Sequence, residues 1–317
     1  MLRLKFFNVG DGDAMLAEVA GESPWRLLVD AGRDEVPGPP PRRSCAEHLR
    51  ALGVDRLDAV VITHLHIDHM GGLMELANQV EIRRVISGYF PSRPGAQMAE
   101  EPHAEKTVQG MIQCLNLWSR TVEMLVRKGC GLERVREPGP IECPAEGLRI
   151  DCALADPEAA SMQRDVWEDM FAGREVPVGM KIAASKLRNL NSLRLRLGYA
   201  GRSAVLAADC FGCLWDDEPG PPCDVLKVPH HGDVKAVTQR LAERLRPRHA
   251  VISCGSEYLP LKDRPSAKGA AMLRGVGAQV WYTDAYDDGR SPARHQPWIE
   301  FEFGDDGRLI GPPDAHE

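Results

Sequence analysis

Apolar residues recur along this chain with two different periods, and these periods predict where strands and helices lie. The first thirty residues read as a β-meander, with strands expected at residues 2–9, 14–19 and 25–29 between turns rich in Gly and Asp. Residues 58–63 form a short and almost wholly apolar run, which is typical of a strand buried on both faces. The N-terminal part is therefore expected to form a sheet.

Four stretches of the chain are expected to form helices. Ser44 and Glu47 form a capping box, which predicts a short helix that ends near Gly53. Apolar residues between positions 108 and 126 predict a long amphipathic helix, and further helices are expected around residues 237–245 and 266–275.

The second half of the chain alternates strands with these helices. Residues 158–180 show no clear period and predict a helix plus a loop, whereas strands are expected at residues 148–154, 192–197, 203–208, 224–228, 250–253, 279–283 and 298–303. An alternation of this kind is typical of the α/β class.

Composition places the chain among soluble globular proteins. It has 317 residues, of which 43% are hydrophobic and 27% charged. No apolar run has the roughly 18 residues of a membrane span, and the first residues do not resemble a signal peptide. The 9 cysteines are scattered without a dense, even spacing, which fits a reducing compartment. We expect a cytoplasmic protein without a membrane partner, and the oligomeric state stays open.

The net charge of −7 opposes binding of a long polyanion unless basic residues cluster locally. One such cluster exists between Val176 and Ala208, where no carboxylate occurs and the positive residues are Lys181, Lys186, Arg188, Arg194, Arg196 and Arg202. A run of this kind is either a solvated face or a surface that holds an anion.

The densest chemistry follows the apolar run at 58–63. The segment His64-Leu65-His66-Ile67-Asp68-His69 places four side chains of metal-ligand type within six residues, and Gly71-Gly72 follows. Histidines two positions apart in an extended segment point to the same side. The sequence therefore predicts a metal site at the end of a buried strand.

The H-x-H-x-D-H segment resembles the signature of the metallo-β-lactamase superfamily. Other segments resemble, in order, motifs of the hydrolase domain of the ComEC/Rec2 DNA-uptake proteins: residues 7–14 (DVGQGDA), 28–32 (LIDAG), Asn191-Ser192-Leu193 and 207–209 (NxxSL…TGD), and 224–232 (DVLKVPHHG). This resemblance implies an α/β fold of the four-layer αββα type. It also implies one domain over residues 1–317, with a poorly matched insertion at about 87–188.

The resemblance implies a centre of two divalent metal ions, Zn²⁺ or Mn²⁺. His64 and His66 would hold the first ion and Asp68 and His69 the second, while Asp209 would bridge them. His230 would complete the second site and His231 would touch the substrate, or these two roles are reversed. The family's third histidine on the first ion is missing, and Asn191 and His103 are the candidates to replace it.

Such a centre implies a hydrolase that uses a metal-bound hydroxide. We expect Asp68, Asp209 and His231 to act in catalysis, and Arg194, Arg196 and Lys227 to bind an anionic, phosphorylated substrate, with nucleic acid among the candidates. The leading expectation is a phosphodiesterase or nuclease. The alternative is a hydrolase of a lactone, β-lactam or thioester, which the same centre can serve. Asp11, Asp13 and Asp30 are expected either to orient the histidines or to make ordinary turns.

Overall fold

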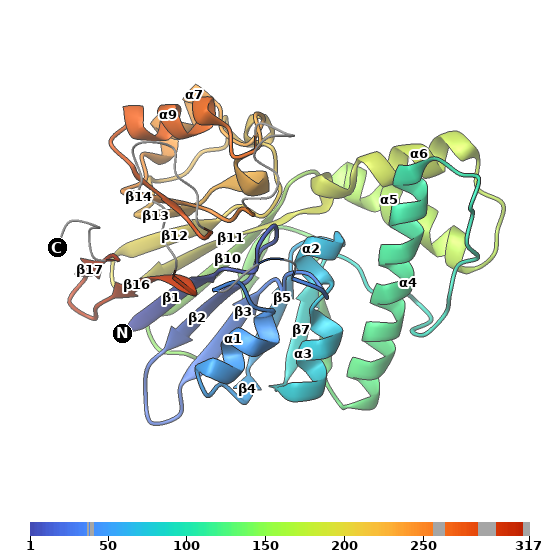
Figure 1. Cartoon of the computed structure of the whole chain (residues 1–317), viewed down its shortest axis with the longest axis horizontal. Coiled ribbons are helices and arrows are strands. Elements are labelled where there is room, and N and C mark those ends of the chain that lie inside the picture. The colour runs from blue at the N-terminus through green and yellow to red at the C-terminus, as the bar shows by residue number, and fades with distance from the viewer. Residues whose placement is uncertain (37, 39–40, 256–263, 285–295, 313–317) are drawn as a thin grey trace.

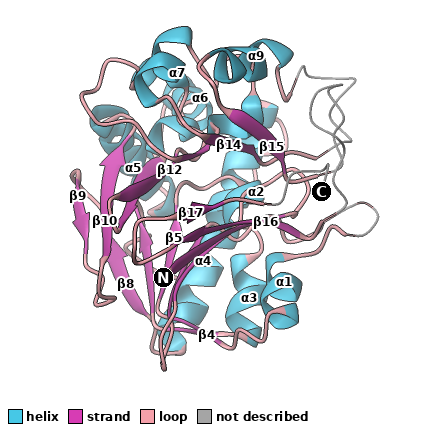
Figure 2. Ribbon diagram, turned by 90° about the vertical axis from the view of Figure 1, so that its left-hand side faces the viewer, coloured by secondary structure: helices cyan, strands magenta, loops and turns pink. Residues whose placement is uncertain are grey.

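Two β-sheets packed face to face, with helices on their outer faces, make up the protein (Figure 1). The computed structural model describes residues 1–36, 38, 41–255, 264–284 and 296–312. From one outer surface to the other, the layers are helices, sheet, sheet and helices (Figures 1 and 2). This is the αββα sandwich that the sequence predicted.

The first sheet begins with the meander. Within the described residues its order is β17-β16-β1-β2-β3-β5-β7-β8. Strands β1 to β3 pair antiparallel, and β3, β5, β7 and β8 then run parallel. The bounds are β1 Leu2–Phe7, β2 Met15–Val19, β3 Trp25–Val29, β5 Ala59–Ile62, β7 Arg84–Ser87, β8 Gly131–Arg134, β16 Trp298–Phe303 and β17 Leu309–Ile310. A separate short pair joins β4 (Arg56–Leu57) to β6 (Glu81–Ile82).

The second sheet has the order β15-β14-β13-β12-β11-β10-β9 within the described part of the chain. Its antiparallel half is β9 to β12, and β12 to β15 run parallel. The bounds are β9 Gly139–Ile141, β10 Leu148–Leu154, β11 Leu193–Tyr199, β12 Arg202–Leu206, β13 Val225–Lys227, β14 His249–Ile252 and β15 Gln279–Tyr282. Figure 2 shows its strands above and beside those of the first sheet.

Helices cover both outer faces. On the first sheet lie α1 (Cys45–Ala51), α3 (Leu73–Gln79) and α4 (Lys106–Arg127), and on the second sheet lie α7 (Gln239–Leu245) and α9 (Ala267–Gly275). Helix α2 (Ile67–Met70) is a single turn after β5. Between β10 and β11 the chain forms α5 (Pro157–Phe171), α6 (Val178–Lys186) and the 3₁₀ turn η1 (Arg188–Asn191), and we call residues 157–191 the helical segment.

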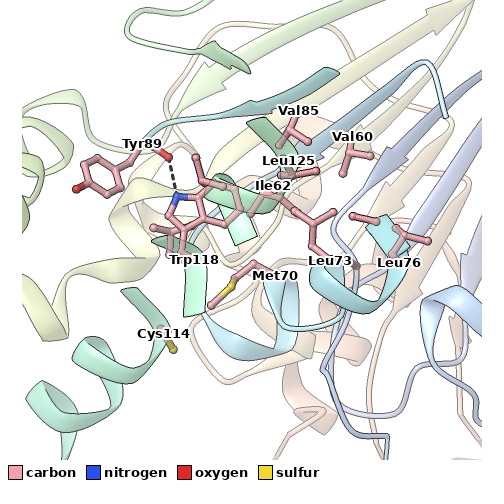
Figure 3. Close-up of a cluster of buried hydrophobic side chains, with 14 of the residues drawn as sticks. Val60, Ile62, Met70, Leu73, Leu76, Val85, Tyr89, Cys114, Trp118 and Leu125 are labelled. Atoms are coloured by element: carbon pink, nitrogen blue, oxygen red, sulfur yellow. Dashed lines mark hydrogen bonds between the residues drawn. The ribbon is translucent and has the colours of Figure 1, made fainter. Parts of the chain in front are cut away.

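The core between α4 and the first sheet is anchored by Trp118 (Figure 3). Its side chain is fully buried, and its indole N–H donates a hydrogen bond of 3.0 Å to the carbonyl of Tyr89. Alternating residues of β10, Ile150 and Cys152 among them, point instead into the core between the sheets.

The expected strands and helices are confirmed, with shifts of a few residues at their ends. Residues 158–180 form most of α5 and the start of α6. Three strands within residues 87–188, namely β8, β9 and β10, belong to the two sheets. Within the described residues, no helix is both long enough and apolar enough to cross a membrane.

Replacing Trp118 by Ala should lower the free energy of unfolding by about 3–5 kcal/mol, because a large buried side chain and its hydrogen bond are both lost. Urea denaturation measures this change. Val126→Ala on the same helix is the matched control, because Val126 is 49% exposed and its truncation should change stability by less than about 0.5 kcal/mol. Equal effects of the two substitutions would contradict this account of the core.

Candidate metal centre

The histidines and aspartates singled out in the sequence meet where three parallel strands end. His64, His66, Asp68 and His69 follow β5, Asp209 follows β12, and His230 and His231 follow β13. The carboxyl ends of parallel strands open on one edge of a sheet, so loops that leave them can converge on a common site. Groups of these residues lie close enough to hold a metal ion.

Asp209 is the centre of this arrangement, and its two oxygens face different partners. Oδ2 lies 3.7 Å from Nε2 of His64 and 3.7 Å from Nε2 of His230. Nδ1 of His66 lies 2.9 Å from Nε2 of His64. We call His64, His66 and His230 the first ligand group.

The other oxygen of Asp209 faces the interior. Oδ1 lies 3.3 Å from Nε2 of His69 and 3.5 Å from Nε2 of His231. Oδ2 of Asp68 lies 3.3 Å from the same nitrogen of His231 and 3.9 Å from that of His69. Asp68, His69 and His231 form the second ligand group.

The two adjacent histidines reach opposite sides of Asp209 because of a sharp turn. His230, His231 and Gly232 form the η3 turn (Pro229–Gly232) with φ values of 45°, 52° and 74°. Consecutive left-handed residues reverse the chain direction. The structure places His231 in the second group and His230 beside His64, which is the reversed order that the sequence left open.

Hydrogen bonds behind the histidines hold their rings with Nε2 toward the centre. His69 Nδ1 donates to Asp30 Oδ2 over 2.8 Å, and His231 Nδ1 donates to the Ser253 carbonyl over 3.1 Å. The Thr63 hydroxyl donates to Asp30 over 2.8 Å and lies 3.2 Å from His64 Nδ1. With the proton on Nδ1, each ring presents the Nε2 lone pair to a metal ion.

Asp13 and Lys227 form a fully buried ion pair behind both ligand groups. Asp13 lies 3.8 Å from Nδ1 of His69 and 3.8 Å from Nδ1 of His231. The ammonium of Lys227 also donates to the Ala208 carbonyl over 3.2 Å. An unpaired buried carboxylate is costly, so Lys227 offsets the charge that Asp13 brings into the interior.

The charges of the centre shift the pKa values of its members. Burial acts to raise the pKa of Asp68, but His69 and His231 outweigh it and hold this pKa well below its usual range. Burial acts to lower the pKa of His69, yet Asp209, Asp30 and Asp68 hold it well above. The pKa of His66 is lowered to about 3, mainly by burial and in addition by the nearby positive charge of Arg188.

The donor set fits divalent metal ions. Asp209 Oδ1 and the Nε2 atoms of His69 and His231 are buried, and none of them makes a hydrogen bond of normal geometry within the described residues. Asp13, Asp30, Asp68 and Asp209 bring four carboxylates together, and Lys227 is paired with one of them. Imidazole nitrogens and carboxylate oxygens are ligands of Zn²⁺ and Mn²⁺, and such ions supply the positive charge that these carboxylates need.

Close backbone approach brings the motif loops together. A Cβ on Gly12 would lie 2.7 Å from the Asp68 carbonyl, and one on Gly72 would lie 2.3 Å from the Ala31 carbonyl. Asp13 N–H donates to that same Asp68 carbonyl over 3.1 Å. Glycine at these positions lets the Asp13 loop lie against the Asp68 turn.

The two candidates for a third ligand of the first ion lie elsewhere. His103 is exposed in the turn before α4. Asn191 donates to the side-chain oxygen of Gln163, inside the helical segment. Asn189 is the residue that reaches the centre, because its amide nitrogen lies 3.4 Å from Nε2 of His230. Counting N-x-x-S-L back from Ser192 gives Asn189, and that spacing could have identified it.

The three basic residues expected to bind substrate are also placed differently. Lys227 is 0% exposed and cannot reach a substrate in this structure. Arg194 pairs with Glu218 at 2.5 Å and lies over the ring of Trp215, and Arg196 donates to the carbonyls of Pro221 and Pro222. Arg194 and Arg196 lie on the face of β11 that points away from the core between the sheets. The two side chains therefore face away from the proposed metal ligands.

The sandwich and its ligand cluster define a class of protein. A family model described as "Metallo-beta-lactamase superfamily" matches residues 25–92 of the chain. That stretch includes β3, β5 and the whole H-x-H-x-D-H segment.

The chain is also similar to individual curated proteins. The chain is similar to ComE operon protein 3 of Bacillus subtilis (strain 168), with 24% identity over 292 residues, which cover 87% of this chain and 31% of that protein. It is also similar to the anti-Pycsar protein Apyc1 of Paenibacillus sp. (strain J14), with 38% identity over 106 residues, which cover 33% of this chain and 36% of that protein. The chain thus spans about a third of the length of the curated relatives it matches.

The chain is also similar to solved structures at low sequence identity. The metallo-β-lactamase fold protein YhfI from Bacillus subtilis has a TM-score of 0.46 and 11% identity, with 88% of this chain and 96% of that chain covered. CmlA, a diiron β-hydroxylase from Streptomyces venezuelae, has a TM-score of 0.48 and 15% identity, with 89% and 52% covered.

Lys227→Met should destabilise the metal-free protein by roughly 3–5 kcal/mol, because it leaves the buried Asp13 carboxylate without its cation. Chemical denaturation in the presence of a chelator measures this. Adding Asp13→Asn to Lys227→Met should recover most of the loss, since the double variant holds no unpaired charge at this position. A double variant as unstable as the sum of the two single variants would contradict the coupling of the pair.

Proposed function

We propose that this chain is a metal-dependent hydrolase with a dinuclear centre, and that its substrate is a phosphodiester. The observation that carries the first part is the geometry of Asp209, whose two oxygens each face one ligand group. A carboxylate that faces two clusters of imidazole and carboxylate donors is suited to bridge two ions.

In this proposal the first ion is held by His64, His66, His230 and Asp209, and the second by Asp68, His69, His231 and Asp209. His230 takes the place for which Asn191 and His103 were candidates. The first ion then has three imidazole ligands, and the second has two imidazoles and two carboxylates. Zn²⁺ fits both sets, and Mn²⁺ fits the more oxygen-rich second set better.

Two divalent ions held in this way would supply Lewis acidity that activates a water molecule and polarises the bond it attacks. The protein's own side chains set the direction from which the substrate would reach these ions. His66, Asp68 and His230 are the partly accessible members of the centre, and the side chains of Asp68 and His230 are 16% and 17% exposed, whereas Asp209 and His231 are buried. In this proposal the substrate approaches from the side of these residues, and the ionised carboxylate of Asp68 helps to orient the attacking water.

The phosphodiester assignment is supported by two observations. The similarity to ComE operon protein 3 covers most of this chain, and the motifs resemble a family of DNA-uptake proteins. An arginine also lies beside the centre: Arg188 is close enough to His66 to affect the pKa of that ring. Positive charge beside the ligands favours an anionic substrate.

We also propose that residues 1–317 form one domain. The strands of the expected insertion belong to both sheets, so the inserted part is better described as the helical segment, residues 157–191.

The test of function uses protein reconstituted with Zn²⁺ or Mn²⁺. Bis-p-nitrophenyl phosphate, single-stranded and double-stranded DNA, and RNA are offered beside a panel of lactones and thioesters. We expect phosphodiester cleavage that is lost in Asp209→Ala. Turnover of a lactone or thioester without any phosphodiester cleavage would instead support the alternative hydrolase.

The metal content of two variants tests the two ligand groups separately. Wild-type protein should bind close to two ions per chain, while His230→Ala and His231→Ala should each weaken a different one. Elemental analysis during a chelator titration measures this. A chain that holds its full metal content after both substitutions would rule out the assignment.

Metal loading should release protons. The pKa of His69 is raised well above its usual value in the metal-free protein, so at neutral pH this ring is protonated on both nitrogens. A metal ion must displace one of these two protons. The pKa of His231 is raised as well, so the apparent metal affinity should rise with pH through the neutral range, and loading should release protons from both rings at pH 7. Calorimetry in buffers of different ionisation enthalpy measures the release. Stoichiometric loading with no proton release would contradict the protonated state of His69.

A further inference from the structure

The basic run between Val176 and Ala208 separates into two kinds of residue in the structure. Four of its six positive side chains pair with carboxylates: Lys181 with Glu101, Lys186 with Glu105, Arg194 with Glu218, and Arg202 with Asp224. Within the described part of the chain, Arg188 and Arg196 have no carboxylate at ion-pair distance. The sequence alone does not distinguish these two kinds.

The hydrogen-bond donors of Arg196 have partners on the outer side of the second sheet. Its guanidinium donates to the Ser203 hydroxyl over 2.9 Å and to the carbonyls of Pro221 and Pro222 over 2.8–3.2 Å. These bonds fix the loop that follows η2 (Gly212–Leu214) and leave the side chain away from the metal ligands.

Arg188 lies beside the centre. Its Nη1 is 3.5 Å from the thiol of Cys114, which in turn contacts the backbone of Ile67, between the ligands His66 and Asp68. The Nε of Arg188 donates to the Ser185 carbonyl over 3.2 Å. The guanidinium thus rests against a neutral thiol and a carbonyl, one side chain away from the metal-binding turn, and it is half-buried.

The next residue fixes this position. Asn189 is 8% exposed, its amide nitrogen is 3.4 Å from His230, and its Oδ1 is buried and has no hydrogen-bond partner among the described residues. Arg188 and Asn189 together bring the η1 turn to both ends of the first ligand group, beside His66 and His230. Two adjacent residues at the rim of the centre thus carry groups that lack a partner among the described residues: Asn189 Oδ1 has no hydrogen-bond donor, and the Arg188 guanidinium has no carboxylate.

We propose that Arg188 is the substrate-binding residue of this centre and that it holds a non-bridging phosphate oxygen. This inference rests on the proposed function and names the contact that selects an anionic substrate. A guanidinium presents a planar set of donors that matches phosphate oxygens, and its charge strengthens each hydrogen bond. Arg264, on the other side, is bound to Asp11 at 2.8 Å, so its charge is largely compensated within the protein.

The test compares Arg188→Ala and Arg188→Lys with the matched control Arg196→Ala, which removes the other arginine of the run without a carboxylate partner. Two quantities are measured on metal-loaded protein: kcat/KM for bis-p-nitrophenyl phosphate, and the affinity for inorganic phosphate by calorimetry. Metal content and the thermal unfolding midpoint are recorded for each variant. The Lys variant keeps the charge and guards against a general loss of folding.

We expect Arg188→Ala to lose about tenfold or more in both quantities with normal metal content, while Arg196→Ala stays close to wild type. Arg188→Lys should recover part of the loss, and the difference between wild type and Arg188→Ala should shrink as salt is raised. Hydrolysis of a neutral aryl ester, where wild type shows it, should be unaffected.

The outcomes separate this inference from the proposed function. Weaker phosphate binding in Arg188→Ala, in a protein that cleaves no phosphodiester, would support the anion contact and reject the phosphodiesterase. Unchanged phosphate affinity in Arg188→Ala would overturn the inference, whatever the activity. Loss of metal in both Arg188 variants would overturn it as well, because Arg188 would then act on His66 and the metal rather than on the substrate.

Discussion

The structure around the centre depends on the burial of several carboxylates within a few ångströms of one another. Asp13, Asp30 and Asp209 are at most 2% exposed, and Asp68 completes the set at the rim. Carboxylates in such proximity repel one another unless cations lie between them. The protein supplies Lys227 to Asp13 and the His69 ring to Asp30. The charge that stays on Asp68 and Asp209 suits the site to divalent cations.

This constraint explains why the fold places its motifs at strand ends. The strands β5, β12 and β13 hold their backbones in the two sheets, so the residues that follow them start from fixed points. Short, sharply bent segments then aim the side chains, as with Gly12 against the Asp68 carbonyl and the left-handed pair His230 and His231. Rigid strands and strained turns together bring groups from distant parts of the sequence within ligand distance of Asp209.

Features that depend on local pattern could be predicted from the sequence. The alternation at residues 148–154 gave strand β10 with its observed bounds, and the H-x-H-x-D-H segment lies at the site. Features that depend on backbone dihedrals or tertiary packing could not. The positions of His230 and His231 on opposite sides of Asp209 follow from two positive φ values, which the residue types do not predict. Lys227 is expected from the sequence to bind the substrate, and only the packing of Asp13 beneath it shows why it is buried.

In the proposed function, the helical segment would link metal binding to substrate choice. The Asn191 side chain bonds to Gln163 of α5, and Gln163 donates to the Ala184 carbonyl of α6 over 3.1 Å, so η1 is tied to both helices. The same turn carries Arg188 and Asn189 to the two ends of the first ligand group. A change in how α5 and α6 pack would therefore move a cation and an amide relative to His66 and His230 while leaving the strand-held ligands in place. Specificity can then diverge through a segment between β10 and β11, because the metal ligands come from other loops.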